Sequence, residues 1–427
     1  MSRLALFAVV GLSFIASQSP AADWEQWRGP GRTGISPDVG LLKDWTARQP
    51  KLLWTASGLG SGYSSVAVAG GRIFTTGNLA DCQAVVCVSP DGKVAWTTKI
   101  TAELPSHQKD GARCTPSIDG DRLYAIASSG KIVCLKVSDG SEVWSKDFKE
   151  WGGRMMSGWG FSESPLVDGD WVLCTPGGSG AMVVALNKLT GQEVWRTAMS
   201  DSSSSKGKGG KGGAGYSSIV VSNAGGVKQY VQLIGTGLIG VRASDGKLLW
   251  QYGRIANGTA NIPTSIVEGD FVFCSSGYRD GGAALLKLVK DGEGIKADEV
   301  YYHPANVLQN HHGQMVLKDG YVYLGHGHNN GYPVCVELAT GKIAWGGSER
   351  GPGSGSAAIT YADGHIIFRY QSGEVALIEA TPSGYKLKGS FKPDYISRNP
   401  CWAQPVVIDG KLYLREQDKL MCYDVRE

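Results

Sequence analysis

The chain has 427 residues, of which 61 are glycine and 13 are tryptophan. Glycine without a three-residue period, with only 17 prolines, excludes collagen, and 42% hydrophobic with 19% charged residues excludes a mostly disordered chain. The formal net charge of +3 is too near neutral to indicate a nucleic-acid-binding protein. Abundant glycine and aromatic residues indicate many tight turns between short strands.

The first 22 residues have the features of a secretory signal peptide. Arg3 supplies the positive charge, residues 4–16 form an apolar run, and Ala21 or Ala22 is a small residue at a cleavage point. The run is too short to span a bilayer comfortably, and no cysteine follows it for lipid attachment. We therefore expect an exported protein of the periplasm or cell envelope without a membrane span. Residues 23–50 are expected to form an N-terminal extension, and residues 51–427 the folded domain.

Nine cysteines are present, an odd number without any CxxC pair. Several lie in apolar runs typical of strands, which predicts small buried hydrophobic side chains. The alternative is that one or two disulfides form, for instance between Cys82 and Cys87 or between Cys401 and Cys422.

A repeated unit occurs eight times along the chain. The copies begin at Ser64, Thr115, Ser164, Ser217, Thr264, Gly313, Ser356 and Gln404. Each unit is predicted to contain a strand, an Asp-Gly-type turn, a second strand, a loop, a third strand, another turn, and in five copies a last strand that carries a tryptophan. Asp-Gly favours tight hairpins because both central residues need a positive φ. A four-stranded meander repeated at this spacing is typical of a β-propeller blade.

The two ends of the repeat region are complementary. The last copy stops after three strands at Val425, and the segment KLLWTAS at 51–57 supplies an isolated outer strand containing Trp54. Joining the two would complete the eighth blade and remove the exposed sheet edges. The predicted fold is therefore an all-β, eight-bladed propeller of four-stranded antiparallel blades, closed by an N-terminal strand.

The turn and the following tryptophan, as in VSDGSEVW, ALNKLTGQEVW and ELATGKIAW, resemble the tryptophan-docking motif A-x-D-x-x-T-G-x-x-x-W. This motif belongs to the PQQ-like (quinoprotein-type) β-propellers, which include quinone-dependent dehydrogenases, the outer-membrane assembly scaffold BamB and uncharacterised exported proteins. The resemblance implies that the outer-strand tryptophans pack between blades while the glycine completes the turn. The tryptophans concerned are Trp54, Trp96, Trp144, Trp195, Trp250 and Trp345.

Residues just before each innermost strand are predicted to line the central channel. The candidate ligand-binding residues are Tyr63, Arg113, Trp159, Glu163, Tyr216, His311, His312, Trp402 and Gln404, joined by His107 and Arg154 from nearby loops. One interpretation is that these groups satisfy one another and water in a wet channel. The other is a pocket for a small anionic or sugar-like ligand, with Arg113 and Arg154 donating to an anion.

Quinone dehydrogenases that resemble this fold bind PQQ beside a Ca²⁺ held by Glu, Asn and Asp, with an Asp as base. Calcium requires 6–8 oxygen ligands, yet Glu163 is the only acid in the channel segments, with Asp110 a little upstream. A vicinal cysteine pair and a CxxCH haem site are also absent from the sequence. We therefore expect no catalytic residues and no cofactor, with PQQ and Ca²⁺ as the alternative.

His326 and His328 are expected on the same side of a strand and, with His311 and His312, form a weak candidate metal site. Residues 200–215, SDSSSSKGKGGKGGAG, are predicted to be a flexible cationic loop between the third and fourth blades. The sequence predicts a BamB-like binding or scaffold module, whose partner is an envelope protein or a small polar ligand and not a nucleic acid. The alternative is a PQQ-dependent dehydrogenase that oxidises an alcohol or sugar.

Overall fold

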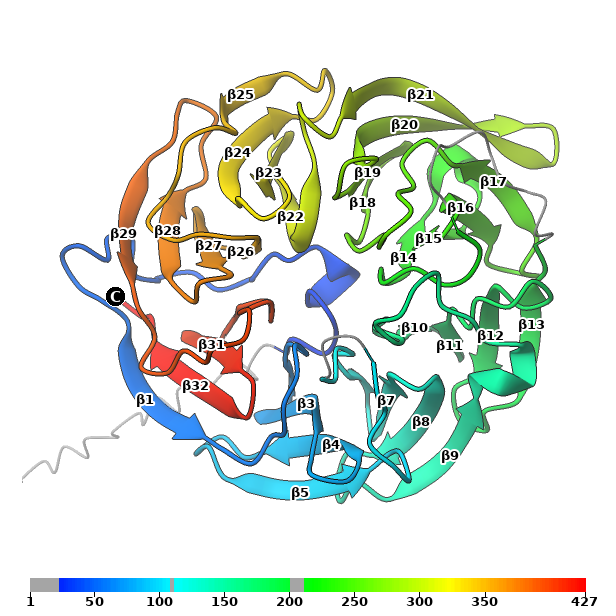
Figure 1. Cartoon of the computed structure of the whole chain (residues 1–427), viewed down its shortest axis with the longest axis horizontal. Helices are drawn as coiled ribbons and strands as arrows, with labels where there is room; N and C mark the ends of the chain where they lie inside the picture. The colour runs from blue at the N-terminus through cyan, green and yellow to red at the C-terminus, as the bar shows by residue number, and fades with distance from the viewer. Residues whose placement is uncertain (1–22, 108–110, 200–210) are drawn as a thin grey trace, which may run out of the picture.

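The computed structural model describes residues 23–107, 111–199 and 211–427. The predicted signal peptide and most of the loop at 200–215 lie outside these residues. The described chain forms eight four-stranded antiparallel sheets arranged as a ring (Figure 1), which confirms the predicted eight-bladed propeller. Across the described ranges, no helix has the length and apolar character required to cross a membrane.

The first four blades follow one another in chain order. Blade 1 contains β2 (Ala67–Ala69), β3 (Arg72–Asn78), β4 (Gln83–Val88) and β5 (Val94–Lys99). Blade 2 contains β6 (Ser117–Asp119), β7 (Arg122–Ala127), β8 (Lys131–Lys136) and β9 (Glu142–Asp147). Blade 3 contains β10 (Leu166–Asp168), β11 (Trp171–Cys174), β12 (Val183–Asn187) and β13 (Glu193–Thr197). Blade 4 contains β14 (Val220–Ser222), β15 (Gln229–Ile234), β16 (Gly237–Arg242) and β17 (Leu248–Tyr252).

The remaining blades complete the ring. Blade 5 contains β18 (Ile266–Glu268), β19 (Phe271–Ser276), β20 (Gly282–Asp291) and β21 (Gly294–Pro304). Blade 6 contains β22 (Asn310–Lys318), β23 (Tyr321–His326), β24 (Tyr332–Glu337) and β25 (Ile343–Gly346). Blade 7 contains β26 (Ala357–Ala362), β27 (His365–Tyr370), β28 (Val375–Glu379) and β29 (Leu387–Phe391). Blade 8 contains β30 (Val406–Ile408), β31 (Lys411–Glu416), β32 (Lys419–Asp424) and β1 (Lys51–Ala56). The described ranges also contain three short 3₁₀ helices, which are η1 (Pro30–Arg32), η2 (Phe148–Trp151) and η3 (Ala224–Gly226).

The Asp-Gly turns adopt the predicted conformation only in part, because at 91–92, 119–120, 139–140, 168–169, 245–246 and 291–292 the glycine alone has a positive φ. At 319–320, 363–364 and 409–410, both the aspartate and the glycine have a positive φ. Such turns match the twist of the strands they join, so each one sets the register of its hairpin.

The ring closes through pairing of β1 with β32, as predicted. The register runs from Lys51 opposite Asp424 to Ala56 opposite Leu420. A buried arginine reinforces this junction, because Arg415 in β31 donates to the backbone oxygen of Gly60 at 2.8 Å and to the hydroxyl of Thr75 in blade 1. The N-terminal strand thus completes the last blade by backbone pairing, and the side-chain hydrogen bonds of Arg415 join that blade to the first.

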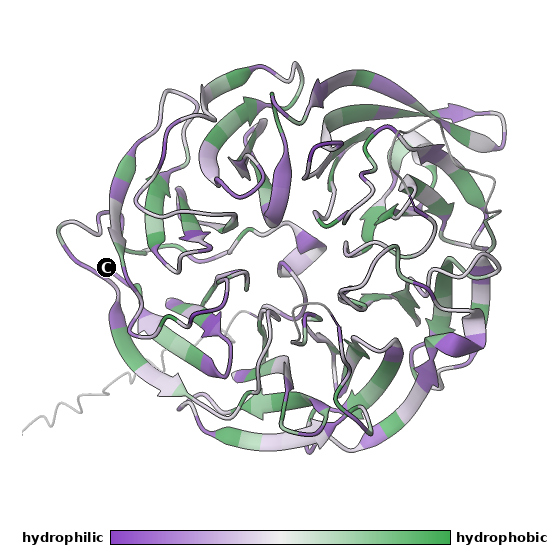
Figure 2. Cartoon of the chain, in the orientation of Figure 1, coloured by the Kyte–Doolittle hydropathy of each residue, from purple (hydrophilic) through white to green (hydrophobic). Residues whose placement is uncertain are grey.

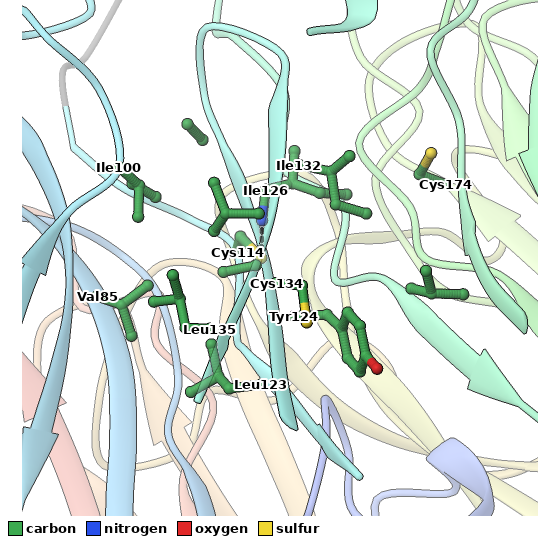
Figure 3. Packing of buried hydrophobic residues seen from close by; sticks show 14 of the residues in the cluster. Val85, Ile100, Cys114, Leu123, Tyr124, Ile126, Ile132, Cys134, Leu135 and Cys174 are labelled. Carbon is green, nitrogen blue, oxygen red and sulfur yellow. Dashed lines mark hydrogen bonds between the residues drawn. The ribbon is translucent and has the colours of Figure 1, made fainter. Parts of the chain in front are cut away.

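The hydrophobic core is divided among the junctions between neighbouring blades. Separate clusters of buried side chains join blades 3 and 4, 4 and 5, 5 and 6, 6 and 7, 7 and 8, and 8 and 1, while a larger cluster joins blades 1 to 3. Figure 2 shows the hydrophobic residues concentrated in the strands within each blade. Figure 3 shows part of the largest cluster, where Val85, Tyr124 and Cys174 come from three successive blades. All nine cysteines are buried and free, so neither candidate disulfide forms.

Four outer-strand tryptophans lie against a glycine in the next blade. A Cβ atom on each of these glycines would lie 2.4–2.7 Å from the indole, so only glycine allows this approach. The pairs are Trp54 with Gly92, Trp96 with Gly140, Trp144 with Gly191, and Trp195 with Gly246. Trp345 instead donates its Nε1–H to the Thr381 oxygen of blade 7 at 2.7 Å.

Trp250 differs from the other five tryptophans. Its Nε1–H donates to Gln229 Oε1 of its own blade at 2.6 Å. In blade 5 the β20–β21 hairpin is longer than its counterparts, and a Cβ atom on Gly292 at its turn would meet nothing within 4 Å. The lengthened hairpin carries its turn beyond the reach of Trp250, although the indole still packs among buried blade 5 residues.

Candidate functional site

Two sets of loops meet at one end of the central channel. Because the strands of each blade alternate in direction, the loops from second to third strands lie at the same end as the segments that lead into the next blade. The hairpins between first and second strands, and between third and fourth strands, lie at the opposite end. The predicted channel segments belong to the first of these two ends.

A cavity of about 280 Å³ is present at that end. It is lined by seven of the predicted residues: Tyr63, Arg113, Trp159, Tyr216, His311, His312 and Trp402. Five of these seven residues come from the segments leading into blades 1, 2, 3, 4 and 8, whereas His311 and His312 lie within β22 of blade 6. The segments are far apart in sequence but meet because each one enters an innermost strand.

Sequence reasoning missed several residues of this channel pocket. Tyr278 comes from the β19–β20 loop, Asn329 from the β23–β24 loop, and Gln371 from the β27–β28 turn. All three belong to connections between second and third strands. The alternation of strand direction in the predicted meander could have placed these connections at the pocket.

The N-terminal extension crosses the opposite end of the channel. In Figure 1 its dark-blue ribbon passes through the centre of the ring. Trp24 N donates to Val68 O of blade 1 at 2.7 Å, and Ser36 N donates to Tyr361 O of blade 7 at 2.8 Å. Between these contacts, Trp27 reaches the channel pocket and supplies part of its lining. The extension therefore contributes to the floor of the pocket.

Arg28 and Arg32 fix the extension to the ends of inner strands. Arg32 is buried, and its Nη1 donates to Ser164 O and Ile219 O, each at 3.0 Å. A third bond runs from its Nη2 to Pro165 O. Arg28, also buried, donates to Met315 O in blade 6. Both arginines have a positive φ, a strained conformation that persists only where surrounding contacts determine it.

Aromatic rings form a continuous surface along one side of the pocket. The His312 and Trp402 rings are stacked, with centroids 4.0 Å apart and an angle of 20° between planes. Tyr63 contacts the Trp402 ring from another direction, at 4.8 Å between centroids. Trp402 Nε1 donates to Gln371 Oε1 at 2.7 Å, which fixes the orientation of the indole. This surface can pack against the flat, apolar face of a ligand.

Arg113 is the one arginine or lysine among the described residues that line the pocket. Its guanidinium lies 5.3 Å from the centroid of the Tyr63 ring. Nη1 donates to Trp159 O at 2.9 Å and to Gly111 O at 3.1 Å. Part of its hydrogen-bonding capacity is therefore used to hold the surrounding loops.

Two histidines of the pocket, His311 and His328, lie close together, and burial favours their neutral form at pH 7. The centroids of the His311 and His328 rings are 4.1 Å apart, and His311 Nδ1 is 2.8 Å from Ser356 Oγ. Burial, with a smaller contribution from His328, lowers the pKa of His311 to about 3. Burial also lowers the pKa of His328. Tyr278 contacts both rings and has a φ of 67°, another strained residue at this site.

The predicted pairing of His326 with His328 is wrong. β23 ends at His326, and His328 follows in a turn, so the two side chains do not share a strand face. His326 Nδ1 accepts a hydrogen bond from Gln309 N at 3.1 Å, and only His328 lines the pocket. Within the described ranges, no three His, Cys, Asp or Glu residues are grouped so as to hold a metal ion.

Four of the predicted ligand-binding residues do not line the pocket. Glu163 is buried beside blades 3 and 4, where its carboxyl accepts hydrogen bonds from Thr175 N at 2.6 Å and from Gln232 Nε2 at 3.1 Å. Gln404 is buried and donates to Ile359 O at 2.8 Å. Arg154 is exposed, and His107 lies against Gly160.

Glu163 should make stability depend on pH between about 6.5 and 8. Burial raises its pKa from 4.5 to about 8, although hydrogen bonds from Thr175 oppose the shift. Over this interval the folded protein retains a proton that the unfolded chain has released, so rising pH favours unfolding. We expect the wild type to lose about 1–2 kcal/mol of unfolding free energy that Glu163→Gln does not lose. Urea denaturation at pH 6.5 and at pH 8 measures the unfolding free energy of each protein. An equal change in unfolding free energy between the two pH values for the wild type and Glu163→Gln would contradict the prediction.

The protein is thus an eight-bladed propeller with an aromatic and polar pocket at one end of its central channel. The N-terminal extension crosses the other end of this channel. The family model described as outer membrane protein assembly factor BamB matches residues 83–347, and the chain belongs to this family. No curated protein matches the chain.

Solved structures with this fold have different functions. BamB from Moraxella catarrhalis has 13% identity and a TM-score of 0.60, covering 88% of this chain and 97% of its own. Quinohemoprotein alcohol dehydrogenase from Comamonas testosteroni has 13% identity and a TM-score of 0.67, covering 96% of this chain and 81% of its own. The computationally designed Ika8 protein has 11% identity and a TM-score of 0.56, covering 88% of this chain and 100% of its own. At these identities the similarity shows the fold alone.

The pocket residues do not fit a calcium-bound quinone such as PQQ. Calcium needs several converging oxygens, usually including carboxylates, and no described residue lining the pocket is Asp or Glu. The nearby Glu163 has its oxygens bonded to Thr175 and Gln232 and remains largely protonated at neutral pH. The donors that are present are hydroxyl, amide, imidazole and guanidinium groups.

Proposed function

We propose that this protein is a non-catalytic binding module of the cell envelope, and that its channel pocket holds a small, polar, ring-bearing ligand. The observation that carries the proposal is the composition of the pocket. Stacked aromatic rings lie beside neutral hydroxyl, amide and imidazole groups, and Trp27 closes the site from the opposite end. Such a combination of aromatic walls with a few oriented polar groups is typical of small-molecule sites.

The protonation states support binding without catalysis. General acid–base catalysis works best with a group whose pKa lies near the operating pH. His311, with its pKa near 3, stays neutral under physiological conditions. Tyr278, whose pKa burial raises to about 12, keeps its proton. Both groups can therefore orient a ligand through hydrogen bonds without exchanging protons with it.

Membership of a family described as an outer membrane protein assembly factor supports a place in the envelope and a protein partner there. In this proposal the pocket ligand and the protein partner use different surfaces, because the pocket is too small for a folded domain.

Signal-peptide processing would be detected by mass spectrometry of the mature N-terminus, which is expected at residue 22 or 23.

A ligand of the channel pocket should raise the melting temperature of the wild type but not of Trp402→Ala. The substitution removes the indole that stacks on His312 and contacts Tyr63, so the aromatic surface is lost. We expect binding to weaken by about 100-fold, in line with the 2 kcal/mol or more that a buried aromatic contact contributes. A thermal-shift screen of monosaccharides, disaccharides, carboxylates, and PQQ with Ca²⁺, followed by calorimetry, measures this.

Trp171→Ala is the matched control, because Trp171 is half-buried and does not line the pocket. Binding that is equally sensitive to both substitutions, or no ligand in the screen, would count against the proposal. Stoichiometric retention of PQQ, with reduction of a dye by an added alcohol, would show instead that the protein is a dehydrogenase.

A further inference from the structure

A second cavity, of about 400 Å³, adjoins the channel pocket. Gln371 and Asn329 line both cavities and therefore form the boundary between them. The other side chains that give the second cavity its character are those of Ser354, Ser372, Ser397, Arg398 and Asn399. The second cavity lies over blades 6 to 8, on the side of the pocket that carries Trp402.

One wall of the second cavity is held in place by hydrogen bonds to a buried ion pair in blades 7 and 8. Ser397 Oγ donates to the carboxylate of Glu416, which is itself paired with Arg369 at 2.8 Å in the interior of blades 7 and 8. Asn399 N donates to Ser397 Oγ at 3.0 Å, so the loop at 397–400 is tied to this buried ion pair. On the opposite wall, Ser354 N and Ser372 Oγ are bonded at 3.1 Å. The cavity is thus bounded by anchored loops.

The two cavities differ in chemistry in a complementary way. The channel pocket has stacked aromatic rings, whereas the described lining of the second cavity contains no aromatic side chain and, besides Gly355 and Pro400, presents hydroxyls, amides and one guanidinium. Hydroxyl and amide groups both donate and accept hydrogen bonds, which suits ligand hydroxyls that also do both. A sugar ring combines an apolar face with an edge of hydroxyls, so it matches the aromatic pocket and then the polar cavity.

Size and charge restrict the ligand further. The channel pocket, at about 280 Å³, is slightly smaller than the range of about 300–1,000 Å³ for ligand sites, and the second cavity brings the combined volume within that range. Each cavity has one cationic side chain in its described lining, Arg113 and the exposed Arg398, and Arg113 already donates to two backbone oxygens. A polyanion would require several converging cations.

We propose that the ligand is a neutral oligosaccharide of at least two units, whose terminal ring stacks in the channel pocket while the next unit occupies the second cavity. The proposal rests on the proposed function, because it names the ligand class of the same pocket. Trp27 closes the inner end of the channel pocket. The oligosaccharide therefore enters with one terminus, and its remaining units extend over the loop at 397–400.

The test is isothermal calorimetry of the full mature chain with glucose and with β-1,4- and α-1,4-linked glucose oligomers, xylose oligomers and mannose oligomers of two to four units. Galacturonic acid oligomers form the acidic series. In at least one neutral series we expect affinity to rise about 10-fold or more from one unit to two or three, and then to level off. Arg398→Ala combined with Asn399→Ala should remove this gain and leave monosaccharide affinity unchanged.

Arg48→Ala combined with Gln49→Ala is the matched control, an exposed arginine and amide pair in the N-terminal extension. Equal affinity for one and three units, tighter binding of the acidic series, or no binding of any saccharide at millimolar concentration would overturn the oligosaccharide assignment. If another compact ligand then binds with sensitivity to Trp402→Ala, the proposed function stands without it. If no ligand shows that sensitivity, both proposals fail.

Discussion

Glu416→Leu should destabilise the propeller by about 3–5 kcal/mol, because it leaves Arg369 as a buried charge without its carboxylate partner. Arg369 Nη2 and Glu416 Oε2 are 2.8 Å apart, and each side chain is only 1% exposed. Arg369 also donates to Ala403 O and Arg415 O, so its guanidinium cannot turn toward water without losing further bonds. Urea denaturation followed by tryptophan fluorescence measures the loss.

The double variant Arg369→Met with Glu416→Leu distinguishes an unpaired charge from a simple packing defect. Replacing a whole buried ion pair with apolar residues of similar size is often close to neutral, whereas removing one partner is costly. We therefore expect the double variant to be more stable than Glu416→Leu alone. If the double variant is the less stable of the two, the buried charge does not dominate the energetics of this site.

Arg32→Met should lower the unfolding free energy by about 2–4 kcal/mol and loosen the N-terminal extension. The substitution removes four hydrogen bonds, three to Ser164 O, Pro165 O and Ile219 O and one to Gln26 Oε1, and such bonds contribute about 1.5–3 kcal/mol each when one partner is charged. Water entering the channel recovers part of this loss. The relevant measurements are urea denaturation and the rate of limited proteolysis within residues 23–50.

Arg48→Met is the control for Arg32→Met, since Arg48 lies in the same extension but is exposed. The two variants should differ in protease sensitivity as well as in stability. Because Trp27 lines the channel pocket a few residues before Arg32, Arg32→Met should also weaken ligand binding. Equal protease resistance of the two variants would show that the bonds of Arg32 do not retain the extension.

Glu163 illustrates why membership of a channel segment does not by itself place a residue in the pocket. Ser162 and Ser164 line the pocket, while Glu163 between them points into the interior between blades 3 and 4. Tyr216 and Ser218 line it as well, whereas the hydroxyl of Ser217 donates to Pro263 O. Successive side chains of an extended segment point in opposite directions, so in these two segments every second residue turns away from the channel.

The blades, their number and the strand that closes the ring could be predicted from the sequence, because recurring local patterns of turns and strands mark each of them. Asp-Gly turns and alternating strands recur within each unit, and Trp54 marks the strand that completes the eighth blade. The position of the N-terminal extension and the shape of the pocket could not be predicted in this way and are known from the three-dimensional structure. Arg32 binds oxygens more than 130 residues away in sequence, and these oxygens converge only where blade 3 packs against blade 4. No local pattern encodes such a contact, since it depends on the relative placement of whole blades.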